Sequence, residues 1–413
     1  MTSFKIYRVG EGEETDMTHS LVSTINRTLA LLCLCLAVPA FAQNGDIDQS
    51  FDVSGVGTLT IRSDAGPIEV STGPAGSVRV RVRNPDDFDV EFSQSGNNID
   101  VIAESDRGGF FGFGRSRIGF RVTVPENFNL DLDTGGGEIE VPDMTGRIVV
   151  DTSGGRITIG DVTGEVSADT SGGRIQIGNV DGNVLADTSG GSIDIGDVTG
   201  DVEADTSGGS IDIGNVGGDV LADTSGGNIT VGETGGDVEL DTSGGTIRAA
   251  WAQGPIEADT SGGNIFLAGS EVSVYADTSG GNIEVERSNG AVTADTSGGN
   301  ITIRQSVGPI RADTSGGRID VELLPGGADS SVYLDTAGGD ITVRIPANHS
   351  ASIFANLEVT RRARDDYRIY TDFPLSINED DDGNIIGRGD INGGGDRIEL
   401  ETVNSDIHII SVQ

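Results

Sequence analysis

Aspartate is the residue whose type and spacing most readily suggest chemistry in this sequence. The motif Asp-Thr-Ser-Gly-Gly, or a close variant, begins twelve times between Asp133 and Asp335. Successive copies keep a constant 18-residue interval as far as Asp313, and only the interval that follows is longer. If the copies stack, their carboxylates form a column that could bind divalent cations, because Ca²⁺ prefers carboxylate oxygens. The candidate metal ligands are Asp169, Asp187, Asp205 and Asp223.

A turn is the simpler role for the same aspartates, and we favour it over the metal column. Each carboxylate would accept backbone N–H groups from its own Ser-Gly corner, as in an Asx-turn. Such hydrogen bonds favour the ionised carboxylate and would lower its pKa. The calcium-binding nonapeptide G-G-x-G-x-D is absent from the sequence.

The Thr and Ser that follow each aspartate would also form columns. Ranks of hydroxyls on a flat face could order water, as on an ice-binding β-helix. The alternative, which we favour, is hydrogen bonding between the hydroxyls along the stack.

Aromatic residues are scarce, at 5% of the chain, and they suggest two local features. Trp251, Phe266 and Tyr275 occupy repeat positions that are usually polar, and aromatic faces could stack on sugar rings. We therefore take these three as candidate ligand contacts, although single exposed aromatics are common on protein surfaces. Phe110, Phe111 and Phe113 lie in a glycine-rich run, which we expect to cap one end of the core rather than enter a membrane.

Catalysis is poorly supported by the residue types present. After residue 42 the chain has two histidines, His349 and His408, and neither cysteine nor lysine. Neither a G-x-S-x-G motif nor a phosphate-binding P-loop occurs. The acidic run Glu379–Asp382 is typical of a solvated loop. The sequence thus predicts a protein that is not an enzyme and needs no cofactor, with a polysaccharide-active enzyme as the least favoured alternative.

The apolar pattern of the repeat identifies the elements that position all of these residues. Ile157 and Ile159 are separated by one residue, as are Val166 and Ala168, and the same slots recur in each following repeat. This alternation indicates strands with one buried face. Glycines such as Gly164 and the Gly-Gly pair of each motif mark two corners, where we expect positive φ.

One repeat is too short for a β-α-β unit but suffices for one turn of a β-helix. We therefore predict an all-β, single-stranded parallel β-helix (β-solenoid) with one 18-residue repeat per coil. A third short strand is expected near Val162, and the uneven slots favour the right-handed form.

Four segments follow from this pattern. Residues 1–42 are typical of a secretory signal with an Ala40-Phe41-Ala42 cleavage site, and Met17 is an alternative start. Residues 43–132 are expected to form irregular coils and a cap, residues 133–345 the regular repeats, and residues 346–413 a second irregular coil and cap. Arg397–Leu400 and Asp406–Ile410 are expected to close the stack. Beyond the signal, no segment is apolar enough to cross a membrane.

The net charge of −40 limits the classes of partner. Such a surface repels nucleic acid and anionic lipid and attracts cations or basic partners. The mature chain would contain no cysteine, because Cys33 and Cys35 both lie in the signal, so disulfides are not expected.

From about residue 50 onward, the sequence resembles the bacterial putative-adhesin domain family, a group of exported β-strand-repeat proteins without an assigned function. The matching segments are Leu59-Thr60-Ile61, Gly66-Pro67-Ile68-Glu69-Val70, Val122-Thr123-Val124-Pro125, the Asp-Thr-Ser-Gly-Gly-x-Ile cores, Val343-Arg344-Ile345-Pro346, Ile398-Glu399-Leu400-Glu401-Thr402 and Asp406-Ile407-His408-Ile409. The resemblance implies a β-solenoid fold and an adhesive role, and it brings no catalytic residues.

Together these features predict a non-catalytic, exported β-helical rod that acts in adhesion or binding at the cell envelope, in the periplasm or on the surface. Its ligand would be a glycan or an envelope protein. The alternative from another class is a structural or regulatory envelope scaffold that self-associates end to end.

Overall fold

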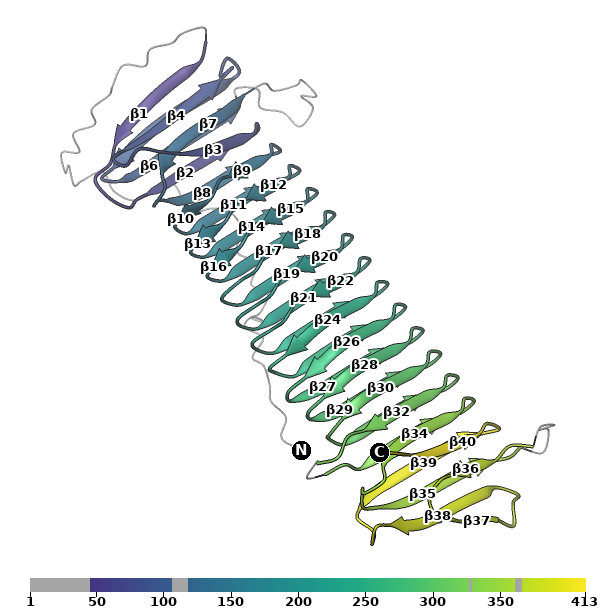
Figure 1. Ribbon diagram of the computed structural model, residues 1–413. Coiled ribbons are helices and arrows are strands. Elements are labelled where there is room, and N and C mark those ends of the chain that lie inside the picture. Colours follow the sequence, from purple (N-terminus) through teal and green to yellow (C-terminus); the bar gives the residue numbers. More distant parts are fainter. Residues whose placement is uncertain (1–44, 106–117, 327–328, 361–365) are drawn as a thin grey trace, which may run out of the picture. The chain divides into compact units, whose positions relative to one another are not determined.

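The computed structural model describes residues 45–105, 118–326, 329–360 and 366–413, which contain strands and turns and no helix. The expected signal segment and the Phe110–Phe113 run lie outside these residues. Stacked parallel strands about 18 residues apart form a β-solenoid of about 12 turns, so the predicted fold class is confirmed (Figure 1). In the described part of the chain, no helix is long and apolar enough to cross a membrane.

One side of the solenoid is a parallel sheet that we call the isoleucine sheet, because its strands carry the Ile-x-Ile pattern. Its regular strands are β9 (Ile139–Val141), β12 (Ile157–Ile159), β15 (Ile175–Ile177), β18 (Ile193–Ile195), β20 (Ile211–Ile213), β22 (Ile229–Val231), β24 (Ile247–Ala252), β26 (Ile265–Ser270), β28 (Ile283–Ser288), β30 (Ile301–Ser306), β32 (Ile319–Leu323) and β34 (Ile341–Pro346).

A second parallel sheet, the aspartate sheet, contains the strands that end in Asp-Thr. Its regular strands are β8 (Asn129–Thr134), β11 (Ile148–Thr152), β14 (Val166–Thr170), β17 (Val184–Thr188), β19 (Val202–Thr206), β21 (Val220–Thr224), β23 (Val238–Thr242), β25 (Ile256–Thr260), β27 (Ser273–Thr278), β29 (Ala291–Thr296), β31 (Ile310–Thr314) and β33 (Val332–Thr336).

A third face connects each isoleucine-sheet strand to the next aspartate-sheet strand. Among the described coils it contains the expected short strand in only three, as β10 (Met144–Thr145), β13 (Val162–Thr163) and β16 (Val180–Asp181). The following coils make single β-bridges here, from Val180–Val198 to Thr234–Ala252. At β24 the isoleucine-sheet strand lengthens to six residues and extends across this face.

The register places equivalent residues of neighbouring coils side by side. Ile193 pairs with Ile211 and Asp205 with Asp223, each partner being one repeat further along the chain, so the predicted stacking is confirmed. Each of the two isoleucines is fully buried. Burial of one such side chain contributes about 1.5–3 kcal/mol, and the columns continue through one apolar core.

The threonine column faces inward, which corrects our expectation of exposed or mutually bonded hydroxyls. Thr188 is fully buried. Its Oγ1 donates to the carbonyl oxygen of Gly173 in the preceding coil at 2.9 Å and accepts the N–H of Gly191 at 3.2 Å. Each threonine therefore bonds to backbone rather than to the next threonine, and this column offers no hydroxyl face to water.

The second glycine of each motif is required by close packing rather than by a left-handed backbone conformation. A Cβ at Gly191 would lie 1.8 Å from the carbonyl oxygen of Gly173. Neither glycine is among the residues with positive φ. Positive φ, which we had expected at both corners, occurs at Gly146, Gly164 and Gly182 of the other corner.

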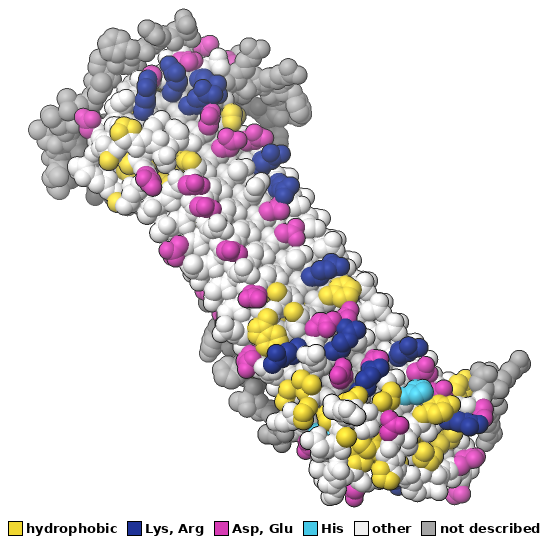
Figure 2. Space-filling model, in the orientation of Figure 1, with side chains coloured by type: hydrophobic (Ala, Val, Ile, Leu, Met, Phe, Trp, Pro, Cys, Tyr) yellow, Lys and Arg dark blue, Asp and Glu magenta, His cyan; other side chains and the backbone are white. Residues whose placement is uncertain are grey.

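The N-terminal end replaces the parallel coils with partly antiparallel strands. These are β1 (Ile47–Asp52), β2 (Thr58–Ser63), β3 (Ile68–Gly73), β4 (Ser77–Arg83), β5 (Phe88–Ser95), β6 (Asn98–Ser105) and β7 (Gly119–Pro125). Strands β2 and β3 form the coil beside β8 and β9. Strands β1, β4 and β5 pair antiparallel with their neighbours and end the two sheets. Figure 2 shows basic side chains gathered at this end, and Arg79 of β4 and Arg121 of β7 pair with the carboxylates of Asp48 and Glu69.

The C-terminal end is interleaved, which corrects the expectation that the last strands close the stack. Its strands are β35 (Ala351–Glu358), β36 (Ile369–Thr371), β37 (Ser376–Glu379), β38 (Ile385–Ile391), β39 (Asp396–Val403) and β40 (Ile407–Val412). Strand β39 lies between β33 and β35, and β40 lies between β34 and β36. The antiparallel strands β38 and β37 then end the aspartate sheet.

Candidate binding groove

An open groove of about 740 Å³ runs along the third face of six successive coils. Its rim on one side is a row of polar residues, one per coil, from Asp161 to Glu233, and Trp251 stands at the end of that row. Two residues further along the coil, a second polar row consists of Thr163, Asp181 and Thr199 in the first three coils of the groove. The remaining lining residues are Val162, Asn179, Val180, Asp197, Val198, Asn215, Val216, Gly217, Thr234, Gly235 and Gln253.

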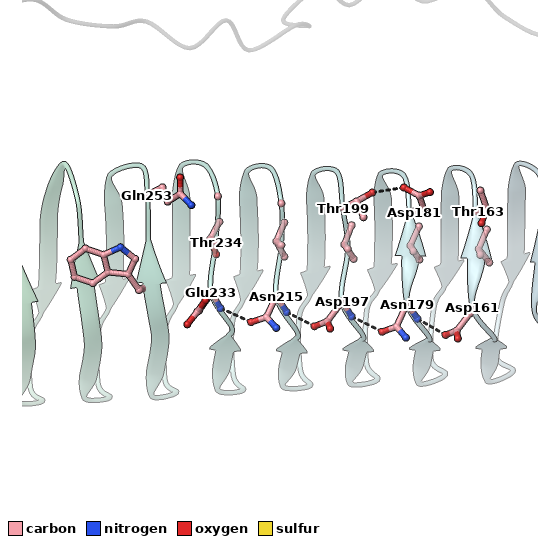
Figure 3. A pocket seen from close by; sticks show the side chains of 17 residues that line it. Asp161, Thr163, Asn179, Asp181, Asp197, Thr199, Asn215, Glu233, Thr234 and Gln253 are labelled. Atoms are coloured by element: carbon pink, nitrogen blue, oxygen red, sulfur yellow. Dashed lines mark hydrogen bonds between the residues drawn. The ribbon is translucent and has the colours of Figure 1, made fainter.

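The first row is a hydrogen-bonded ladder that follows the stack (Figure 3). The Oδ1 atom of each Asp or Asn accepts the backbone N–H of the equivalent residue in the next coil, at 2.7–2.9 Å. The members that line the groove are, in order, Asp161, Asn179, Asp197, Asn215 and Glu233. Because Oδ1 is used in every rung, the position and rotamer of each Asp or Asn side chain of the ladder are fixed.

The second terminal atom of each ladder side chain is unused. Among the described residues, no hydrogen bond or ion pair is made by Oδ2 of Asp161 or Asp197, or by Nδ2 of Asn179 or Asn215. A carboxylate oxygen accepts and an amide nitrogen donates. The groove rim therefore presents acceptor, donor, acceptor, donor in consecutive coils, with a spacing of about 4.8 Å.

A glycine before each ladder residue makes room for the rung. A Cβ at Gly178 would lie 2.6 Å from the Oδ1 of Asp161, and one at Gly196 would lie 2.7 Å from that of Asn179. The coil after Glu233 has Ala250 in this slot and Trp251 in the ladder position, both within β24. The loss of the Gly-Asx pair thus ends both the corner and the ladder.

The Trp251 side chain lies against the next coil. It pairs in register with Gly269, which in turn pairs with Arg287. A Cβ on Gly269 would lie 3.1 Å from the indole Cζ3, so glycine leaves room for the ring. The guanidinium carbon of Arg287 lies 5.5 Å from the indole centroid, within the range of a cation–π contact. The half-buried indole is therefore preorganised at the end of the groove.

The other two candidate aromatics lie elsewhere. Phe266 is on the outer face of the isoleucine sheet, where Arg248 of the preceding coil stacks on it at 5.0 Å. Tyr275 is 40% exposed on the outer face of the aspartate sheet. The two ring–ring pairs of the described residues, Phe51–Phe92 and Tyr370–His408, involve none of the three candidates. The structure thus brings Trp251 and Phe266 to neighbouring strands and separates Tyr275 from both.

The aspartates of the repeated motif form a different column, on the outer face of the aspartate sheet. The expected Asx-turn is wrong, because the corner N–H groups bond to the threonine hydroxyl instead. The pKa is raised rather than lowered: burial and then the neighbouring aspartates raise the pKa of Asp187 and Asp223. Burial, then Asp277 and other nearby carboxylates, raises the pKa of Asp259 to about 6.

The metal candidates Asp169, Asp187, Asp205 and Asp223 are successive members of this column, each paired in register with the next. In the parts of the chain that the structure describes, no group of three or more His, Cys, Asp or Glu side chains is arranged to hold a metal ion. A cation between these coils would therefore have to share two carboxylates and complete its shell with water.

Sequence reasoning missed the ladder at Asp161 and its equivalents. The signal was present, since Asp161, Asn179, Asp197 and Asn215 alternate in type from one repeat to the next. Each follows a glycine that comes directly after an isoleucine-sheet strand, and among the six coils of the groove only the coil of Trp251 lacks this glycine.

Comparison with known proteins gives one family match. Residues 56–250 match the family model described as Toastrack DUF4097, and the resemblance to putative adhesins is confirmed. No curated protein sequence is significantly similar to this chain.

Three solved structures are similar to this chain at low sequence identity. A putative cell adhesion protein from Clostridium sporogenes is 7% identical, covering 88% of this chain and 99% of its own, with a TM-score of 0.16. A putative adhesin from Bacteroides fragilis is 13% identical, covering 90% and 98%, with a TM-score of 0.17. A putative lipid binding protein from Parabacteroides distasonis is 15% identical, covering 71% and 97%, with a TM-score of 0.21. At these values the neighbours give no information on the ligand of this chain.

Proposed function

We propose that this chain, which matches the Toastrack family over residues 56–250, is an exported, non-catalytic binding protein that holds a ligand along its third face. The observation that carries the proposal is the groove, whose rim has unused hydrogen-bonding atoms in fixed positions and ends at a preorganised indole. Binding sites usually combine apolar lining with a few placed polar groups. The groove has this composition over six coils.

Replacement of Trp251 tests the site. We expect Trp251→Ala to weaken ligand binding by the full chain at least tenfold, because it removes the only aromatic face among the described lining residues of the groove. Tyr275→Ala is the matched control, since Tyr275 lies on the other sheet and should leave affinity unchanged. Binding would be measured by arrays of glycans and of envelope proteins. Equal loss of binding in the two variants, or no loss in either, would contradict the assignment of the groove.

The alternative function for the same groove is catalysis on a polysaccharide. Release of reducing ends from a panel of acidic polysaccharides would demonstrate it, and we expect none. In the proposed role the carboxylates of Asp161 and Asp197 are structural, because Oδ1 of each accepts a hydrogen bond from the next coil.

Self-association at the ends is a second candidate function, favoured by one observation. The outermost strands β1, β5 and β37 each pair with only one neighbour among the described strands, and such edges can pair with another chain. Light scattering at two protein concentrations tests this function. A mass that rises with concentration would support end-to-end assembly, and a constant monomer mass would exclude it.

Export is proposed from the leader-like residues 1–42. Fractionation of cells that express the tagged full chain should place the protein in the envelope or medium. Retention in the cytoplasm would overturn this part of the proposal.

A further inference from the structure

We infer that the ligand of the groove is a linear, β-linked glycan that lies along the stack. One sugar would lie beside each coil, and the contacts would repeat every two sugars. The inference rests on the proposed binding function and adds the chemical class and orientation of the ligand. Three features carry it: the alternation along the rim, its repeat length, and the platform at its end.

The alternation of the rim matches the chemistry of sugar hydroxyls. Oδ2 of Asp161 and Asp197 can only accept, whereas Nδ2 of Asn179 and Asn215 can only donate. A hydroxyl both donates and accepts, so a chain of sugars can satisfy every member of the row. Neither a polycation nor a polyanion can do so, because each would face groups of the wrong type in every second coil.

The repeat length separates a glycan from a peptide in the extended β conformation. The rim repeats every two coils, which is about 9.6 Å at the spacing of parallel strands. An extended peptide repeats every two residues, or about 6.7 Å, and would fall out of register within one repeat of the rim. A flat β-1,4-linked glycan repeats every two sugars over a length close to two coils, and can keep its register along the whole row.

The end of the groove provides a surface for a sugar ring. Trp251 lies over Gly269 and is held there by Arg287, so its orientation needs little ordering when a ligand arrives. Apolar ring faces bind sugars through their C–H groups, and a fixed aromatic side chain loses little entropy on binding. The ladder also changes at this point, since Glu233 replaces the Asp or Asn of earlier coils.

The alternation can be tested without breaking the ladder. Asn179→Asp and Asn215→Asp keep the Oδ atom that binds the next coil and convert the outward donor into an acceptor. Asp197→Asn makes the opposite change of type and of charge. Asn228→Asp is the matched control, because Asn228 forms an equivalent rung to Thr246 at 2.8 Å outside the groove lining. The probes are β-1,4-linked oligomers of glucose and of N-acetylglucosamine, from the disaccharide upward, with α-1,4-linked glucose oligomers for comparison.

We expect the full chain to bind at least one β-1,4 series, with affinity that rises with length until the groove is filled. Each of the three groove variants should weaken binding about tenfold, because a hydroxyl that turns to meet the reversed group gives up its hydrogen bond within the bound chain, and one such lost bond has this range. Asn228→Asp should bind like the original chain, and the α-linked oligomers should bind weakly.

Three results would overturn the inference. Unchanged affinity in the groove variants, with binding still lost in Trp251→Ala, would leave the proposed binding function standing and reject the alternation as its basis. Binding of a protein segment at the groove with no affinity for any β-linked oligomer would reject the ligand class alone. Absence of any ligand that depends on Trp251 would reject the proposed function as well.

Discussion

The threonine and the second glycine of the repeated motif are each required by contacts between neighbouring coils. The threonine hydroxyl joins two coils through backbone groups, and the second glycine lets the same backbone approach closely. The sequence already contained the orientation of the threonine, because the alternation that buries Val166 and Ala168 also buries Thr170. The close contact that requires glycine could not be predicted from the sequence, because it depends on the distance between two corners rather than on φ.

Thr188→Val should destabilise the protein by about 1–3 kcal/mol, because it leaves the carbonyl of Gly173 and the N–H of Gly191 without a partner in a buried site. Urea unfolding measures the change. Thr230→Val makes the same substitution on the outward face of β22 and should have little effect. Equal stability of the two variants would show that the buried hydroxyl contributes nothing.

Gly191→Ala should cost more than about 2 kcal/mol, because its Cβ would lie 1.8 Å from the carbonyl oxygen of Gly173 and the corner must move. The adjacent Gly190→Ala is the control, with its nearest atom at 3.8 Å. It should be neutral or slightly stabilising, since alanine reduces the freedom of the unfolded chain. Thermal melting compares the two, and a similar drop in both would refute the close-approach argument.

Within the aspartate sheet, the column of neighbouring aspartates makes the stability of the fold depend on pH. The pKa of Asp259 rises to about 6, through burial and then through Asp277 and other carboxylates, against about 3.9 in an unfolded chain. The folded state thus binds this proton more tightly. Its contribution to stability is fully present below about pH 4 and is lost as the pH rises to about 6.

Asp259→Asn should therefore raise the melting temperature relative to the original chain at pH 7 and make little difference at pH 4. Asp212→Asn, which removes the same charge from the isoleucine sheet, controls for net charge. Melting of all three proteins across pH 4 to 8 gives the comparison. A stabilising effect of Asp259→Asn that is equal at both pH values would contradict a role for this titration.

Divalent cations can be examined in the same column. With one motif aspartate per coil and no group of three acidic, His or Cys side chains arranged to hold a metal in the described residues, we expect excess chelator to leave the melting temperature unchanged. A fall in the melting temperature that added Ca²⁺ reverses would instead establish a metal column.

At the scale of the whole molecule, the repeat makes coils interchangeable units. Deletion of residues 193–210 joins Ser192 to Ile211 and preserves both sheets, since Ile193 and Ile211 occupy the same slot. We expect a folded protein with an unchanged far-ultraviolet circular dichroism spectrum and a cooperative melt. Deletion of residues 193–201, half a repeat, would pair unlike slots and should prevent cooperative folding. Cooperative melting of both deletions would mean that the register is not set by the repeat.

The sequence predicted the stack of coils because the apolar slots of Ile157, Ile159, Val166 and Ala168 recur without interruption. It did not predict the ends, because no spacing links β39 to β33 or β1 to β4, and their pairing depends on strands far apart in the chain. The groove could be predicted only in part. Trp251 was recognisable from the sequence, because it replaces a polar residue at its repeat position. The hydrogen bond that one Asx oxygen accepts from the next coil was not predictable, because it depends on the depth of the corner.

The interleaved C-terminal end has a consequence for the order of assembly. Strands β35 and β36 leave the ribosome before β39 and β40, yet their parallel neighbours in the sheets are those later strands. They must wait unpaired on that side until residues 396–412 arrive and dock on β33 and β34. Growth of the regular coils can proceed in step with synthesis or passage through a channel, but completion at this end must be delayed until those strands have emerged.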